Sequence, residues 1–149
     1  MSQTSASSYV SKVTKPNDFD DFWDKVLSDL ESIPINSEVV QDHIKTTDDV
    51  DVFHVTFDSL DNVRIFGWYC LPKKLNRELP AILTVPGYNA EPGISLHLAR
   101  KGYAAFDVAP RGKLGSHHQY NPGYPGLLTY NIVDRNTYSY RGFYADAWR

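Results

Sequence analysis

Residues 80–108, PAILTVPGYNAEPGISLHLARKGYAAFDV, decide the fold of this 149-residue chain. Residues 81–85 form a short apolar run, which predicts a central strand covered on both faces. A turn-rich loop follows, and the apolar spacing of residues 94–99 indicates a short helix that Gly102 ends as a left-handed cap. Residues 103–108 predict a second strand. Because strand, helix and strand in this order favour a right-handed crossover between parallel strands, we expect an α/β fold.

Two further strands are predicted upstream of this unit. Apolar and polar side chains alternate in residues 50–57, where Phe53, Val55 and Phe57 share one face. Residues 63–71 are equally rich in β-forming side chains. Because only a short polar stretch separates the two runs, the sequence predicts an antiparallel pair joined by a turn.

An amphipathic helix is predicted before these strands. Its apolar residues recur at the i, i+3, i+4, i+7, i+8 and i+11 positions of one stripe: Phe19, Phe22, Trp23, Val26, Leu27 and Leu30. Asn17 or Asp18 can cap its first turn, and Pro34 stops it. Residues 1–15 are predicted to form a mobile leader, so the folded domain is expected to comprise residues 16–149.

A long segment and a second amphipathic helix follow the parallel strands. Residues 109–136 are rich in glycine, proline, tyrosine and histidine, and a loop of this length is expected to contribute to a site or an interface. Residues 137–149 predict a helix that the sequence leaves unfinished. We expect other protein to bury its apolar face, which consists of Tyr140, Phe143, Tyr144, Ala147 and Trp148.

Composition narrows the class of protein. With 42% apolar and 13% aromatic residues, most of the chain is expected to fold around a core. The net charge of -3 arises from mixed acidic and basic residues, so nucleic acid is not an expected partner. Cys70 is the single cysteine, and we expect neither a disulfide nor a metal or cofactor. Without a secretion signal or an apolar run of about 20 residues, a cytoplasmic protein outside the membrane is expected.

Four stretches of the chain resemble the acetyl xylan esterase and cephalosporin-C deacetylase family: residues 16–23, 52–68, 80–93 and 107–148. Together they span nearly the whole sequence. The most specific motifs occur in the same order as in the family. They are Gly87-Tyr88-Asn89, Arg111-Gly112, Tyr124-Pro125-Gly126, and the segment from Asn131-Ile132-Val133-Asp134 to Tyr138-Ser139-Tyr140-Arg141-Gly142.

The resemblance implies a serine esterase of α/β-hydrolase fold that removes acetyl groups from sugar and cephalosporin-like esters, often as an oligomer. Family members are about twice as long. Residues 16–149 would then be a partial α/β-hydrolase domain, an N-terminal portion of the sheet with antiparallel first strands followed by parallel strands, truncated before the nucleophile elbow. The nucleophile, acid and histidine of the triad are not expected in this chain, which lacks Gly-x-Ser-x-Gly. Alone it is expected to be inactive.

One element of the catalytic machinery is implied within these residues. Gly87-Tyr88-Asn89 matches the loop after the third strand of the family, so the backbone N–H of Tyr88 would be one of two oxyanion donors. The Tyr88 ring would also line the acyl pocket. Pro86 and Lys113 depart from the family pattern, in which some members have His and Gln at these positions, and neither change removes the donor.

Other candidate residues have a catalytic and a structural interpretation. Ser116 lies in a loop and not in a strand-to-helix elbow, and Ser95 is separated from His97 by a spacing that places them on different helix faces. The structural interpretation is therefore favoured for both serines. The adjacent pair His117-His118 has no further ligand at a suitable spacing, so a solvated loop is favoured over a metal site.

Polar and aromatic residues at the end of the strand predicted for residues 103–108, and in the segment after it, also have two interpretations. Asp107 and Arg111 lie at the end of that strand, where functional groups gather in open α/β sheets. A structural role as an ion pair or loop anchor is favoured over a role in a functional site. Six tyrosines could stack on sugar rings, although packing of the loop or of a subunit contact is favoured: Tyr120, Tyr124, Tyr130, Tyr138, Tyr140 and Tyr144.

Two interpretations of function stay open. The first is part of a carbohydrate esterase that acts on acetylated sugars or small esters. The second is a non-catalytic half-domain for oligomerisation or partner binding, because half a sheet leaves an unpaired edge and exposed apolar faces. It would pair with itself or with a separately encoded C-terminal half.

Overall fold

The computed structural model describes residues 10–74, 77–123 and 125–149. Most of the predicted leader lies outside the described residues, and its described part, residues 10–15, is exposed. The first helix, α1, spans Phe19–Glu31 as predicted. Asp18 stands at its N-cap position, but the Asp18 carboxylate makes no capping hydrogen bond and instead forms an ion pair with Arg135.

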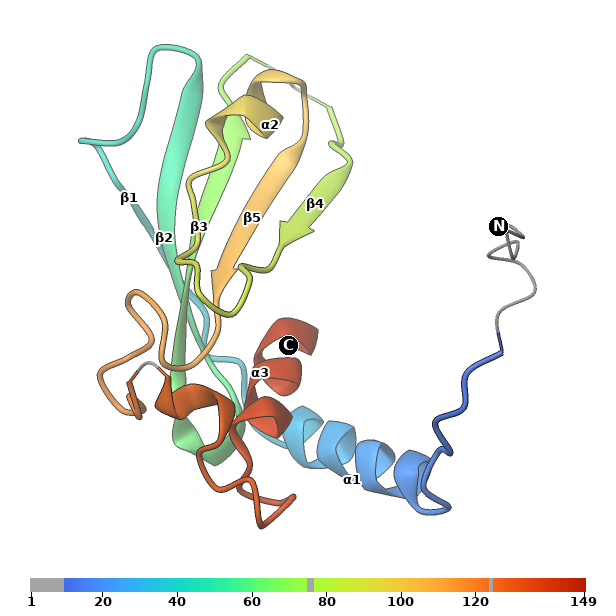
Figure 1. The fold of residues 1–149 in the computed structure, drawn as a ribbon. Coiled ribbons are helices and arrows are strands. Elements are labelled where there is room, and N and C mark those ends of the chain that lie inside the picture. Colours follow the sequence, from blue (N-terminus) through green and yellow to red (C-terminus); the bar gives the residue numbers. More distant parts are fainter. Residues whose placement is uncertain (1–9, 75–76, 124) are drawn as a thin grey trace, which may run out of the picture.

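The described residues form one mixed sheet of five strands in the order β1-β2-β3-β5-β4 (Figure 1). The strands are β1 Glu38–Gln41, β2 Val50–Asp58, β3 Arg64–Pro72, β4 Ala81–Thr84 and β5 Ala104–Ala109. The pairs β1–β2, β2–β3 and β3–β5 are antiparallel, whereas the pair β4–β5 is parallel. The predicted antiparallel pair, the parallel pair and the α/β fold are therefore confirmed.

The predicted central position of the strand in residues 81–85 is wrong. β5 lies between β3 and β4, so β4 is an edge strand among the described residues. Leu83 is consequently 51% exposed. The apolar run indicates a strand that suits burial on both faces, but strand order is set by the crossover and cannot be read from the run itself.

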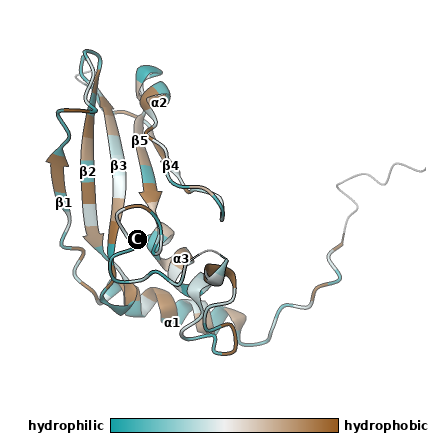
Figure 2. Ribbon diagram, turned by 60° about the vertical axis from the view of Figure 1, so that its left-hand side comes forward, coloured by the Kyte–Doolittle hydropathy of each residue, from teal (hydrophilic) through white to brown (hydrophobic). Residues whose placement is uncertain are grey.

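The crossover helix, α2 (Leu96–Arg100), covers one face of the sheet. Its Ala99 packs with buried side chains from three strands in a single core cluster that includes Val52, Cys70 and Ala105. Gly102 has φ of 93° and ends the helix in the left-handed conformation, as predicted. Figure 2 shows hydrophobic segments along the strands under this helix.

The last helix, α3 (Ser139–Trp148), lies beside α1 at one end of the sheet (Figure 1). The helix itself is confirmed, but the face that it buries is the opposite of the apolar one. Its buried residues are Ser139, Gly142, Ala145 and Asp146. Tyr144 and Trp148 are 59% and 68% exposed. Tyr140, Phe143 and Ala147 are half-buried, so the described residues cover the apolar face only in part.

Candidate active site

The loops that follow the parallel strands meet near the C-terminal ends of β4 and β5, where ligands bind in open α/β sheets. Tyr88 belongs to the loop after β4, and Lys113 to the loop after β5. The Lys113 ammonium donates a hydrogen bond to the carbonyl oxygen of Tyr88 and lies 5.8 Å from the centre of its ring. The Tyr88 hydroxyl donates to the carbonyl oxygen of Pro125 at 2.8 Å. The predicted oxyanion loop is thus held at both its backbone and its ring.

A small apolar pocket of about 190 Å³ lies against this loop. Its walls come from the two strand ends and from the aromatic face of α3. They are formed by Val85, Pro86, Gly87, Tyr88, Pro110, Lys113, Tyr140, Phe143, Tyr144 and Ala147. The structure therefore brings the Tyr88 loop together with the apolar helix face, an association that the sequence did not indicate.

Ser95 is a structural residue. Its hydroxyl donates to Asp107 Oδ1 at 2.7 Å, and its backbone N–H donates to Asp107 Oδ2 at 2.9 Å. The Thr84 hydroxyl donates to the same carboxylate. Asp107 therefore fixes the start of α2 to the end of β4. His97 is exposed and is absent from this network.

Ser116 is structural as well. Its buried hydroxyl donates to the carbonyl oxygen of Ala109 at 2.6 Å and accepts from the backbone N–H of Phe66 at 2.7 Å. These two bonds tie the loop after β5 to β3. The structural interpretation of both serines agrees with this geometry, since each hydroxyl serves a buried backbone or carboxylate contact.

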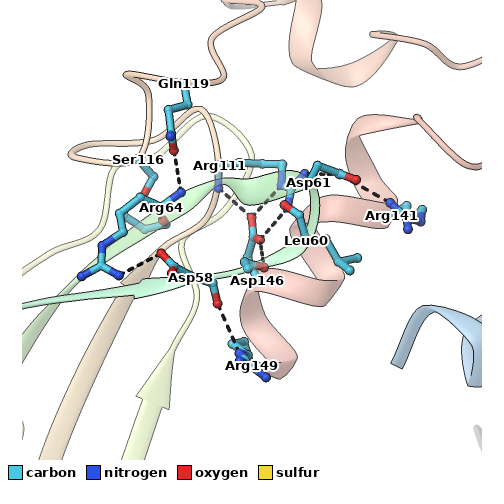
Figure 3. Close-up of polar contacts among 12 residues, drawn as sticks. Asp58, Leu60, Asp61, Arg64, Arg111, Ser116, Gln119, Arg141, Asp146 and Arg149 are labelled. Carbon is cyan, nitrogen blue, oxygen red and sulfur yellow. Dashed lines mark hydrogen bonds and ion pairs between the residues drawn. The ribbon is translucent and has the colours of Figure 1, made fainter. Parts of the chain in front are cut away.

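Arg111 is the centre of a buried ionic cluster (Figure 3). Its guanidinium is 3% exposed and donates from Nε and Nη2 to the two carboxylate oxygens of Asp146, both at 2.9 Å. Further donations reach Asp61 Oδ2 at 3.0 Å and the carbonyl oxygen of Leu60 at 3.1 Å. The Ser59 hydroxyl completes the cluster by donating to Asp146 Oδ1 at 2.6 Å. Arg111 is therefore a loop anchor, as favoured, but Asp107 is not its partner.

The electrostatics of this cluster keep Arg111 charged. Burial alone would lower the pKa of the guanidinium, but the hydrogen bonds and charges of Asp146 and Asp61 outweigh burial and raise that pKa. Gly142 gives the guanidinium its place, because a Cβ atom built there would lie 2.4 Å from Arg111 Cζ. The Arg111-Gly112 and Arg141-Gly142 motifs of the resemblance thus contribute to one packing contact.

Sequence reasoning missed Asp146, Asp61 and Ser59 as partners of this cluster. The available signal was weak: Asp146 stands four residues after Gly142, on the same helical face, and is the one acidic residue of the helix. An acidic residue at such a position indicates a buried cation elsewhere in the chain. The identity of that cation could not be read from the sequence.

The tyrosines of the long segment pack against one another and against the helices. Tyr138 stacks on Tyr140 with ring centres 5.4 Å apart, and Tyr120 meets Tyr130 edge-on at 5.5 Å. Tyr144 contacts the Trp23 ring of α1 at 5.7 Å. This geometry agrees with the favoured packing role, whereas Tyr124 lies outside the described residues.

His117 and His118 lie side by side with ring centres 4.5 Å apart. Within residues 10–74, 77–123 and 125–149, no group of three His, Cys, Asp or Glu side chains could hold a metal ion. The same part of the chain contains no helix that is long and apolar enough to cross a membrane. The cytoplasmic location and the absence of a nucleic-acid partner stay predictions.

The mixed sheet, with its parallel β4–α2–β5 unit, matches the N-terminal part of an α/β-hydrolase of the esterase class. The family model described as acetyl xylan esterase (AXE1) matches residues 1–149, so the chain belongs to the acetyl xylan esterase family.

Two solved structures show the same fold. An acetyl xylan esterase from Paenibacillus sp. R4 is similar with a TM-score of 0.79 and 29% identity over 93% of this chain and 46% of that one. Acetyl xylan esterase 1 from Thermoanaerobacterium sp. JW/SL YS485 is similar with a TM-score of 0.76 and 20% identity over 88% of this chain and 43% of that one. The chain thus spans less than half the length of either structure.

Proposed function

We propose that this chain forms the oxyanion-loop part of a carbohydrate esterase that removes acetyl groups from sugars or from cephalosporin-like esters. One observation carries the proposal: the Tyr88 loop is held at the C-terminal end of β4 by Lys113 and Pro125, next to an apolar pocket of about 190 Å³. A pocket of this character suits a small acyl group. The acetyl xylan esterase family match supports the reaction class.

The chemistry assigned to Tyr88 is electrostatic. In acyl transfer, negative charge develops on the carbonyl oxygen of the ester, and a fixed backbone N–H directed at that oxygen lowers the barrier by roughly 3 kcal/mol. The Tyr88 N–H is proposed as one of two such donors. The contacts from Lys113 and Pro125 support this role because they restrict the movement of the loop that carries the donor.

We propose that the serine nucleophile, the acid and the histidine come from residues outside these 149. Ser95 and Ser116 are held in buried hydrogen bonds, which supports this assignment. The complete enzyme would then form an acyl-serine intermediate that water hydrolyses. The 149-residue chain alone would be inactive.

The first test is hydrolysis of 4-nitrophenyl acetate by the purified chain, together with labelling by a serine-directed phosphonate that is located by mass spectrometry. We expect neither turnover nor labelling. Turnover with labelling at Ser95 or Ser116 would overturn the assignment of the nucleophile to residues outside the chain.

The second test supplies the part of the solved esterase that these 149 residues do not match. Residues 1–149 replace the matched half of the Paenibacillus enzyme in a chimera, and folding is checked by circular dichroism before turnover is measured. Tyr88→Pro, which removes the N–H, is expected to lower kcat about 100-fold. Tyr88→Phe keeps the N–H but loses the hydroxyl contact to Pro125, so it is the control that measures the loss of that contact alone. A folded, labelled chimera in which the Tyr88→Pro variant is as fast as the control would contradict the oxyanion role.

A second candidate function is a half-domain that binds another protein chain. A groove of about 470 Å³ on the sheet face opposite α2 favours it, since its lining includes Val39, Tyr69, Leu83 and Phe106. Leu83 belongs to β4, whose outer edge has no strand partner among the described residues. An apolar face beside an open edge is the kind of surface that a second copy or a complementary half would cover.

Light scattering coupled to size-exclusion chromatography tests this second function on the chain alone. We expect a dimer or larger oligomer, which Leu83→Asp weakens. Val40→Asp, an equally exposed apolar position on β1, is absent from the groove lining and is the matched control. A folded chain that is strictly monomeric at high concentration would count against self-association.

A further inference from the structure

A second pocket adjoins the Tyr88 loop and differs in character from the apolar one. It encloses about 460 Å³, within the range of about 300–1,000 Å³ that small-ligand pockets occupy. Tyr88 and Lys113 line both pockets, and the other lining residues differ. Tyr88 and Lys113 are therefore the boundary between an apolar pocket and a polar one.

The side chains that line the polar pocket offer both donors and acceptors. Glu91 accepts the backbone N–H of Leu114 on one carboxylate oxygen at 2.7 Å, which leaves its other oxygen for a ligand. Asn121 accepts the backbone N–H of Gly123 at 3.2 Å and keeps its amide NH₂ group. Asn89 and His117 add an amide and an imidazole to the lining.

The charges in this lining favour a neutral ligand. Lys113 is the cation of the pocket and Glu91 its carboxylate, so the formal charges of the two side chains cancel. The Lys113 ammonium is also engaged by the Tyr88 carbonyl oxygen. A phosphate or carboxylate ligand would be repelled by Glu91 as well as attracted by Lys113, so the lining carries no net charge that favours an anion.

We propose that the polar pocket binds the hydroxyl groups of the sugar that bears the acetyl ester. This inference rests on the proposed esterase function and adds the site of its alcohol part. Sugar hydroxyls donate and accept hydrogen bonds, which matches the amides, imidazole and carboxylate of the pocket. An acetylated sugar lying across Tyr88 places its small acyl group in the apolar pocket and its polar ring in the other.

Binding of unacetylated xylobiose to the ¹⁵N-labelled 149-residue chain, followed by NMR, tests this assignment because it requires no catalytic triad. We expect saturable amide shifts confined to residues 87–91, 112–117 and 121–123. Asn89→Ala removes an exposed amide that makes no hydrogen bond within the described residues, so the fold should be kept. It should weaken binding about three- to tenfold, as the loss of one hydrogen bond does. Asn17→Ala, an exposed asparagine just before α1, is the matched control and should bind as the unchanged chain does.

Three outcomes would overturn the inference: no saturable shifts, shifts outside the pocket, or equal binding by the Asn89→Ala variant. Tighter binding of inorganic phosphate at the same amides would identify an anion site instead. The esterase proposal is tested separately by the chimera. If the chimera hydrolyses the ester but the 149-residue chain does not bind xylobiose, only the proposed sugar site is contradicted. If the chain binds xylobiose but the chimera is inactive, only the catalytic assignment is contradicted.

Discussion

The helices α2 and α3 dock in different ways. α2 packs through apolar side chains, with Ala99 fully buried in the cluster of Val52 and Cys70. α3 instead packs through Gly142 and Asp146 against the guanidinium of Arg111 and through Ala145 against α1, and turns Tyr144 and Trp148 outward. The apolar face decides which side of α2 is buried, whereas in α3 the requirement of a buried cation decides it.

This difference shows what an amphipathic pattern can and cannot tell. A stripe of apolar residues identifies the face that gains from burial, but it does not say what buries it. In α3, a buried guanidinium without its carboxylate would cost about 3–5 kcal/mol, and this exceeds the gain of about 1.5–3 kcal/mol from covering one aromatic side chain. The aromatic face is left to line the pocket beside Tyr88 and to meet Trp23.

Removal of the carboxylate of Asp146 should have the largest effect on stability. Asp146→Ala leaves Arg111 charged, buried and without its bidentate partner, so the free energy of unfolding should fall by about 3–5 kcal/mol. Urea unfolding followed by tryptophan fluorescence measures it. Asp61→Asn changes the exposed partner of the same guanidinium and should cost less than about 1 kcal/mol. Equal losses of unfolding free energy in the two variants would contradict the claim that the buried partner of Arg111 contributes more to stability than the exposed one.

A cavity under α2 should have the next largest effect. Val52→Ala removes two methyl groups from a fully buried position and should lower the free energy of unfolding by about 2 kcal/mol. Val40→Ala on β1 is the control, because Val40 is 61% exposed and lies outside the groove lining, so its truncation should change stability by less than about 0.5 kcal/mol. If the Val40 variant lost as much as the Val52 variant, burial under α2 would not set the cost of truncating a valine.

A methyl group added between α3 and Arg111 by Gly142→Ala should have a smaller effect on stability. In most helices Gly→Ala stabilises by about 1 kcal/mol, but at Gly142 the new Cβ would meet Arg111 at 2.4 Å. Overpacking of about 1–3 kcal/mol therefore outweighs the helical gain, and the net loss should be about 1 kcal/mol by thermal unfolding. Gly93→Ala meets no atom within 4 Å and is the control. A stabilised Gly142→Ala variant would show that α3 does not need this close approach.

The elements that local patterns specify were predicted from the sequence. The period of Phe19 to Leu30 gave α1, and the alternation in residues 50–57 gave β2. β1, Glu38–Gln41, was missed because its four residues are mostly exposed and form a strand by pairing with the edge of β2. The edge position of β4 was also missed, since the order of strands depends on the path of the whole chain.

The candidate site was predicted only in part, for a similar reason. The Tyr88 loop was found through the resemblance, because its motif is contiguous in the sequence. Arg111 and Asp146 stand 35 residues apart, and Ser59 stands 87 residues from Asp146. No periodicity relates such positions, so the ionic cluster could be identified only from the fold.

The thiol of Cys70 lies under α2 and allows a last test of how firmly that helix is held. Its ionisation should not affect stability at pH 7. Burial under α2, together with the charge of Asp107, raises the pKa of Cys70 to about 11. A disulfide reagent at pH 8 should therefore react with the unfolded chain and not with the native one. Because the unfolded thiol ionises near pH 8.5, the unfolded chain binds fewer protons than the native chain above that pH, and stability should fall between about pH 8.5 and 11. Cys70→Ala should lose this part of the pH dependence.

Rapid labelling of the native chain at pH 8 would mean that α2 opens readily. Apolar packing would then hold α2 less firmly than the ionic cluster holds α3.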